Sequence, residues 1–131
     1  MPPPSLASAE LSLMRRLWND GPATAKELVQ RLYPTSAKPQ HGTVQRLLSR
    51  LEAKGYVAAN RGVRPQRFAA VVSDREYAGG QLEALADAVT GGSMAPLLTH
   101  MVQGERLTSE EIGELRRLLD EHTRSHAAED A

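Results

Sequence analysis

Apolar residues recur at helical spacing between positions 40 and 54. In the stretch QHGTVQRLLSRLEAKGY, the positions i, i+3, i+4 and i+7 are occupied by Val44, Leu47, Leu48 and Leu51. This spacing predicts an amphipathic helix over residues 40–54 with one buried stripe. The polar side of such a helix, taken alone, is an ordinary solvated face, so its role depends on the elements around it.

Two further helices are predicted before this stretch. Ser8 is a suitable N-cap for a helix over residues 9–19. Thr24 and Glu27 have the spacing of a capping box, which predicts a second helix that ends at Leu32. Two such helices joined by a brief turn are typical of a helix-turn-helix.

A β-hairpin is predicted after the third helix. Two strand-like segments, at about 56–60 and 67–71, flank the sequence RGVRPQ, whose glycine and proline suit a turn. Three helices closed by a hairpin predict a winged helix-turn-helix domain over residues 8–73. A flexible leader is expected before it, over residues 1–7.

Residues 74–122 predict three more helices without an evident core of their own, and a flexible tail is expected over residues 123–131. A region of this size is close to the limit for independent folding. Its apolar residues either fold back on the winged helix or pack against the same surface of a second chain; we favour the second arrangement, an isologous homodimer. The residues expected in that contact are Leu82, Leu85, Val89, Leu97, Leu98, Met101, Val102, Ile112, Leu115, Leu118 and Leu119. The predicted fold class is mainly α (α+β): a winged helix-turn-helix with a C-terminal three-helix dimerisation region.

The formal net charge of zero conceals two halves of opposite sign. Residues 1–74 contain 11 Lys and Arg against 5 Asp and Glu, whereas residues 75–131 contain 5 against 11. The first half is therefore the better place to look for a polyanion-binding surface, although a basic face is more often merely solvated.

The start of the third helix carries side chains that can read DNA bases. A helix that enters the major groove contacts bases mainly through its N-terminal residues. Glutamine can pair with adenine, arginine with guanine, and a threonine methyl can pack on thymine. Gly42 permits close approach of the backbone. The candidate base-reading residues are His41, Thr43, Gln45 and Arg46.

Other basic and polar residues around this helix are candidates for phosphate contacts. The hairpin holds three arginines within seven residues, a composition suited to phosphates or an adjacent minor groove. A solubilised loop is the alternative interpretation of these arginines, and Thr24 serves equally well as an N-cap alone. The candidates are Thr24, Lys38, Arg50, Lys54, Arg61, Arg64 and Arg67, with Lys26 and Ser36 as further possibilities.

No arrangement typical of an enzyme or a metal centre is evident, so we predict no enzyme activity, no cofactor and no metal. The four histidines form no HExxH motif. His122 and His126 are four residues apart, but they lie where the last helix is expected to fray, which favours a solvated pair. The absence of cysteine excludes disulfides, thiol nucleophiles and thiolate ligands.

A cytoplasmic, bacterial-type protein without a membrane partner is expected. No apolar run approaches the roughly 20 residues of a membrane span. The N-terminal sequence MPPPSLAS lacks the basic and apolar regions of a secretory signal.

Three stretches of the sequence resemble the penicillinase and methicillin-resistance repressor family of bacteria. They are LSLMRRLWNDGPATAKELVQRL, GTVQRLLSRLEAKGYV and SMAPLLTHMVQGERLTSEEIGELRRLLDE, which together extend from about Leu11 to Glu121. The resemblance implies a dimeric transcriptional repressor that binds a palindromic operator. It also implies a sensor protease as partner and a cleavage segment at His100 and Met101, where this chain lacks the Asn-Phe bond of antibiotic-sensing members.

Two functions are therefore compared. The first is a homodimeric repressor that binds double-stranded operator DNA through helix 40–54 and a basic wing. The alternative is a winged helix used as a protein-interaction module without sequence-specific DNA binding. DNA binding requires that Arg46, Arg50, Arg61 and Arg64 share one surface and that the edge from Thr43 to Arg46 is accessible.

Overall fold

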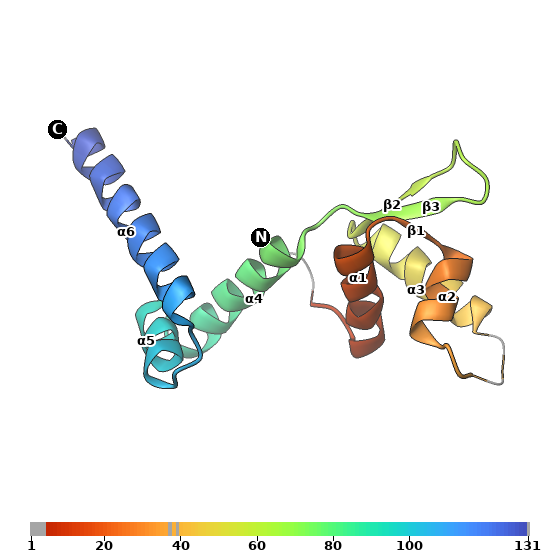
Figure 1. Ribbon diagram of the computed structural model, residues 1–131, viewed down its shortest axis with the longest axis horizontal. Helices are drawn as coiled ribbons and strands as arrows, with labels where there is room; N and C mark the ends of the chain where they lie inside the picture. Colours follow the sequence, from red (N-terminus) through yellow and green to blue (C-terminus); the bar gives the residue numbers. More distant parts are fainter. Residues whose placement is uncertain (1–4, 37, 39, 131) are drawn as a thin grey trace. The chain divides into compact units, whose positions relative to one another are not determined.

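The structure is a computed structural model that describes residues 5–36, 38 and 40–130 (Figure 1). The chain divides into two compact units, Met1–Leu85 and Ala86–Ala131. Helix α4 (Asp74–Val89) begins in the first unit and ends in the second. The described residues form helices and one small antiparallel sheet of three strands, which confirms the predicted α+β winged-helix class.

Helix α1 (Ser8–Asp20) begins one residue earlier than the sequence indicates. Its N-cap is Ala7, whose amide donates to Glu10 Oε1 at 2.9 Å. The prediction that Ser8 is the N-cap is therefore wrong. The Glu10 carboxylate reaches back to accept the hydrogen bond of the Ala7 amide, so the helix begins at Ser8 without a hydroxyl cap.

The residues before α1 are held to the first unit. The Leu6 amide donates to Tyr77 Oη at 3.1 Å, and Ser5 Oγ donates to Gln81 Oε1 at 3.0 Å. Leu6 also packs against the core. The predicted flexible leader is thus docked over the part that the structure describes, and its residues 1–4 lie outside the described residues.

Helix α2 (Ala25–Leu32) has the predicted capping box and the predicted end. Thr24 Oγ1 accepts a hydrogen bond from the Glu27 amide at 3.1 Å, and Glu27 Oε1 accepts one from the Thr24 amide at 3.2 Å. The backbone hydrogen bond from Thr24 is the largest of the interactions that lower the pKa of Glu27.

Helix α3 (His41–Ala53) ends in a Schellman motif. The Gly55 amide donates to the Glu52 carbonyl at 3.1 Å, and the Tyr56 amide donates to the Leu51 carbonyl at 2.8 Å. Gly55 has a φ of 85°, a conformation that glycine adopts without strain. The predicted bounds, 40–54, agree with this helix to within one residue at each end.

The sheet contains the hairpin and one strand that the sequence did not indicate. Strands β2 (Val57–Asn60) and β3 (Arg67–Ala70) pair antiparallel as predicted. The two-residue strand β1 (Ala23–Thr24) adds to the other side of β3, giving the order β1-β3-β2. Ala23 pairs with Phe68 and Thr24 with Arg67. Strand β1 therefore joins the start of α2 to the base of the hairpin.

The core of the first unit lies among α1, α2, α3 and the sheet. Trp18 Nε1 donates to the Val72 carbonyl at 2.9 Å, and the ring of fully buried Tyr56 lies edge-on to Tyr77 with centroids 6.0 Å apart. These contacts attach the start of α4 to the winged helix. The buried apolar residues are Leu13, Met14, Leu17, Ala23, Ala25, Leu28, Val44, Leu47, Leu48, Leu51, Tyr56, Val57 and Phe68.

The second unit contains the end of α4, α5 (Ala95–Gln103) and α6 (Ser109–Asp130). Thr108 and Glu111 cap α6 with reciprocal hydrogen bonds of 2.9 and 3.1 Å. The helix continues eight residues beyond His122, where its end was expected. The sequence TRSHAAED contains neither glycine nor proline, so nothing in it interrupts the backbone hydrogen bonds.

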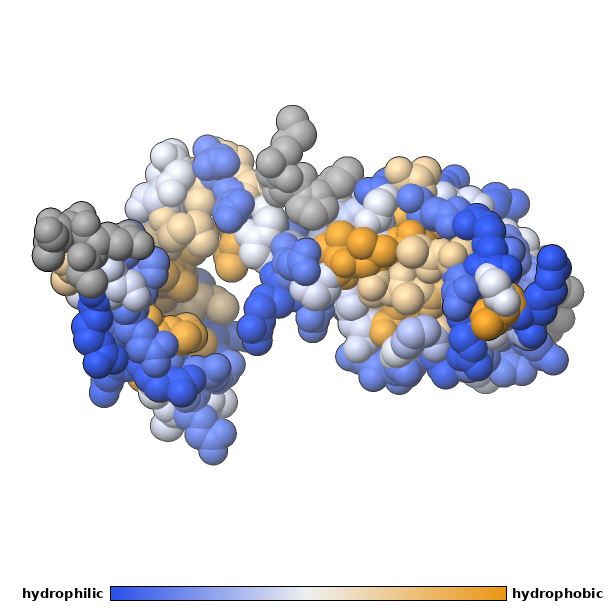
Figure 2. Space-filling model, turned by 90° about the horizontal axis from the view of Figure 1, so that it is seen from above, coloured by the Kyte–Doolittle hydropathy of each residue, from blue (hydrophilic) through white to orange (hydrophobic). Residues whose placement is uncertain are grey.

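The second unit leaves most of its large apolar side chains exposed. Among the side chains that the structure describes in this unit, only Ala86 is buried. Figure 2 shows hydrophobic surface on this part of the chain. The described helices include none that is long and apolar enough to cross a membrane.

Candidate nucleic-acid interface

The first turns of α3 present polar side chains away from the core. His41, Gln45 and Arg46 are exposed, whereas Thr43 is half-buried and its hydroxyl donates to Gln40 Oε1 at 3.1 Å. His41 Nε2 and Gln45 Nε2 lie 3.3 Å apart, at hydrogen-bond distance. The edge that the sequence singled out is therefore accessible, with Thr43 more restricted than its neighbours.

Gly42 lies on this edge and has free space around it. A Cβ atom built on Gly42 meets nothing within 4 Å, and its φ is outside the left-handed region. The folded chain by itself therefore does not require glycine at this position. A ligand that approaches the backbone closely is a physical reason for its presence.

A hollow of about 290 Å³ joins the beginnings of α2 and α3 to the hairpin. His41 and Gln45 line it from α3, and exposed Lys26 lines it from α2. The rest of the lining consists of Thr24, Ala25, Pro65, Gln66 and Phe68. The hairpin residues of this hollow were not identified from the sequence, because only the pairing of β1 with β3 brings them to the helix.

The three hairpin arginines differ in their contacts. Arg61 NH2 contacts both carboxylate oxygens of Glu52, on α3, at 3.1 and 3.3 Å. Arg67 NH1 lies 3.8 Å from Glu27 Oε1. Arg64 is exposed and makes no hydrogen bond or ion pair with any residue that the structure describes. Arg61 thus holds the hairpin beside α3, and Arg64 is the more accessible cation.

Two of the other predicted phosphate contacts are engaged within the protein. Thr24 is 7% exposed, and its hydroxyl oxygen accepts the capping hydrogen bond of α2. Lys54 Nζ lies 2.9 and 3.0 Å from the two carboxylate oxygens of Glu10, which is 2% exposed. Arg50 and Lys38 are exposed, and Lys38 is within the turn before α3.

The carboxylate of Glu10 depends on this lysine. Burial alone would raise the pKa of Glu10, but hydrogen bonds from Lys54 and Ala7 and the charges of Lys54 and Arg50 hold it below its ordinary value. Lys54 therefore stabilises a buried charge and fixes the end of α3 on α1. The sequence suggested that Lys54 contacts phosphate, but in the fold its ammonium group is paired with Glu10.

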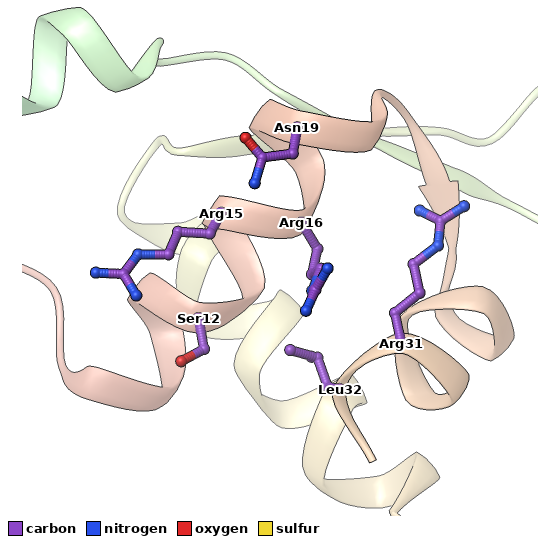
Figure 3. Close-up of a pocket in the computed structure, with 6 residues that line it drawn as sticks. All are labelled: Ser12, Arg15, Arg16, Asn19, Arg31 and Leu32. Atoms are coloured by element: carbon purple, nitrogen blue, oxygen red, sulfur yellow. The ribbon is translucent and has the colours of Figure 1, made fainter. Parts of the chain in front are cut away.

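Another basic hollow, of about 320 Å³, lies between α1 and α2 (Figure 3). Its lining includes Arg15 and Arg16 from α1 and Arg31 from α2. Arg31 is paired with Asp20 at 3.6 Å and with Glu27 at 3.3 Å, and its guanidinium points away from that of Arg15 (Figure 3). None of the candidate base-reading residues lines this hollow. Arg15 is accordingly an exposed arginine against which the α3 arginines can be compared.

The predicted dimer contact residues lie on α4, α5 and α6, and most are exposed. Leu97 is half-buried. An apolar hollow of about 330 Å³ between α5 and α6 gathers five of them with Leu107: Leu98, Val102, Ile112, Leu115 and Leu119. His100 and Met101 are exposed within helix α5. The described residues hold no group of three or more metal-ligating side chains.

Comparison with known proteins identifies the family of this chain. The family model described as penicillinase repressor matches residues 6–121. The penicillinase repressor of Bacillus licheniformis is 25% identical over 91% of this chain and 92% of that protein. The transcriptional regulator BlaI of Mycobacterium tuberculosis is 34% identical over 92% of this chain and 87% of its own length. The chain thus belongs to the penicillinase repressor family, a family of DNA-binding transcriptional regulators and not of enzymes.

Proposed function

We propose that this protein is a homodimeric repressor that binds a palindromic operator through the start of α3 and the hairpin. The observation that carries the proposal is the shared surface of these two elements. His41 and Gln45 line one hollow with Pro65 and Gln66, and the Arg61–Glu52 ion pair holds the hairpin beside α3. If α3 lies in the major groove, the basic side chains of the hairpin beside it can contact the DNA phosphates.

Within this surface, Arg46 and Arg64 have different roles. Arg46 is exposed on the first turns of α3, where a guanidinium can pair with the edge of a guanine. Arg64 lies in the turn of the hairpin, where it can reach a phosphate or an adjacent minor groove. Base contacts give selectivity, whereas phosphate contacts bind all sequences alike.

Fluorescence anisotropy with the DNA upstream of the protein's own gene tests the proposal. Wild-type protein should bind this DNA more tightly than a scrambled duplex of equal length and composition. Equal affinity for both duplexes would contradict operator binding and favour the protein-interaction alternative.

Arginine variants separate the two kinds of contact. Arg46→Ala should reduce the preference for operator over scrambled DNA by about 1–3 kcal/mol. Arg64→Ala should weaken both duplexes alike and lower the slope of log K against log salt by about one. Arg15→Ala removes the same charge from the α1–α2 hollow and should change neither quantity. A loss as large in Arg15→Ala would mean that net charge alone determines binding.

The second unit supports the dimer part of the proposal. Leu98 is 53% exposed and Leu115 is 40% exposed in the single chain, and both line the apolar hollow between α5 and α6. Apolar patches of this kind mark contact surfaces, and a two-fold dimer is the commonest way to cover one.

Sedimentation velocity tests the dimer directly. Leu115→Asp should convert the dimer to monomer and weaken operator binding, because each half-site would be bound independently. Thr99→Asp adds the same charge at an exposed position of α5 outside the hollow and should leave the dimer intact. A wild-type protein that sediments as a monomer at micromolar concentration would contradict this part.

A further inference from the structure

His122 and His126 form a convergent pair on the last turns of α6. Their Nε2 atoms lie 2.8 Å apart, and their ring centroids are 4.3 Å apart at an interplanar angle of 77°. Both residues are exposed, and both lie within a helix that extends to Asp130. The sequence favoured a solvated pair because the helix was expected to fray at these residues. In the structure α6 continues through both histidines.

The distance between the two nitrogens fits one geometry of metal coordination. A bond from imidazole nitrogen to a first-row divalent metal is about 2.0 Å long. Two nitrogens at adjacent corners of a square-planar site are then about 2.8 Å apart, and this geometry is typical of Cu²⁺ and Ni²⁺. Two tetrahedral ligands of Zn²⁺ would be about 3.3 Å apart at the same bond length. The observed 2.8 Å matches the square-planar value.

We propose that His122 and His126 bind one divalent copper ion per chain, independently of DNA binding. In the free protein, one Nε2 carries the hydrogen that the other accepts. When the metal binds, that ring gives its Nε2 proton to water and takes up a proton at Nδ1, so both Nε2 lone pairs are donated to Cu²⁺ and both rings are neutral. Water fills the remaining positions. Spacing of i and i+4 on one helix face is the spacing that metal-binding helices use.

The preference among metals follows from the ligands. Imidazole nitrogen binds Cu²⁺ more tightly than Ni²⁺ or Zn²⁺, in accordance with the Irving–Williams order. Mg²⁺ and Ca²⁺ prefer oxygen ligands and should not bind. The sequence offers no cysteine to compete for copper elsewhere.

Titration of the untagged full chain with CuCl₂, followed by calorimetry and by electron paramagnetic resonance, tests the proposal. We expect one Cu²⁺ per chain and a spectrum with two coordinated nitrogens. Loss of a group that merely supports a metal ligand weakens binding about 10–100-fold, so His122→Ala and His126→Ala should each lose at least about tenfold in affinity. His100→Ala, which removes another exposed helical histidine, should bind as the wild type does.

The sharpest control keeps the number of histidines and changes only their spacing. The double variant H126A/A127H places the second imidazole one residue further along α6, about 100° around the helix, where it cannot share an ion with His122. It should bind as weakly as His126→Ala while its circular dichroism shows unchanged helix content. Equal Cu²⁺ affinity in wild type and this variant, a single coordinated nitrogen, or one ion shared by two chains would each overturn the proposal.

Discussion

Replacement of Gly42 by alanine should affect stability and DNA binding in opposite directions. Gly42 is the second residue of α3, its backbone is outside the left-handed region, and an added Cβ meets no atom within 4 Å. Alanine is about 0.8–1.0 kcal/mol better than glycine in a helix interior. A position in the first turn gains less, so we expect about 0.5 kcal/mol of added stability, which raises the Tm of a domain of this size by about 2–4 °C.

The same methyl group should weaken operator binding. If the start of α3 enters the major groove, the added Cβ separates the backbone from the bases. The loss should equal about one base contact, roughly 1–3 kcal/mol, or about tenfold in Kd near the lower end of that range. Thermal unfolding by circular dichroism and anisotropy on operator DNA measure the two effects on the same protein.

Gly79 provides the matched control for this experiment. It lies within α4 in the same unit, and a Cβ built there also meets nothing within 4 Å. Gly79→Ala should therefore raise Tm and leave operator affinity unchanged. A Gly42→Ala protein that binds the operator as tightly as the wild type would refute the close approach of α3. A lower Tm would refute the interpretation that the site is open in the free protein.

Three further predictions concern the interactions that hold the winged helix together. Lys54→Met should lower the free energy of unfolding by about 1–3 kcal/mol, less than for a fully buried pair because the lysine is 33% exposed, and urea unfolding at pH 7 measures the loss. Because the pKa of Glu10 is lowered on folding, its stabilisation is complete above about pH 4.5 and is lost as the pH falls through the folded-state value. Urea unfolding from pH 7 to pH 3 should show a shallower decline for Glu10→Gln than for the wild type, and parallel curves would contradict the assignment. Thr24→Ala should cost about 1–2 kcal/mol through loss of the cap of α2, and Thr24→Ser, which keeps the hydroxyl, should recover most of it.

Local sequence signals were sufficient for most helices and for the hairpin. The capping pairs at Thr24 and Thr108 and the terminating Gly55 are interactions between near neighbours in the chain, so their residue types specify the structure. The α3 stripe is buried as predicted because its periodicity reflects one face turned to the core. The same periodicity identified the accessible edge of α3.

Features that depend on distant residues were missed. Strand β1 has two residues, too few to show a period, and exists because β3 pairs with it. Glu10, the partner of Lys54, is 44 positions away, so the residues around Lys54 gave no sign of the ion pair. The sequence therefore suggested a phosphate contact instead. Arg61 likewise meets Glu52 only after the hairpin has folded beside α3. The convergence of His122 and His126 depended on where α6 ends, which the composition of the tail did not decide.

The short strand β1 has a mechanical consequence for DNA recognition. Thr24 caps α2 and also pairs with Arg67 at the base of the hairpin, while Arg61 secures the hairpin to α3. The hairpin is therefore tied to both α2 and α3, which restrains it from following a groove of different width while α3 stays in place. If α3 and the hairpin bind DNA as proposed, the duplex must make most of the adjustment, and stiff or flexible base steps will differ in the energy of that adjustment. Operator choice should thus include base pairs that no side chain touches.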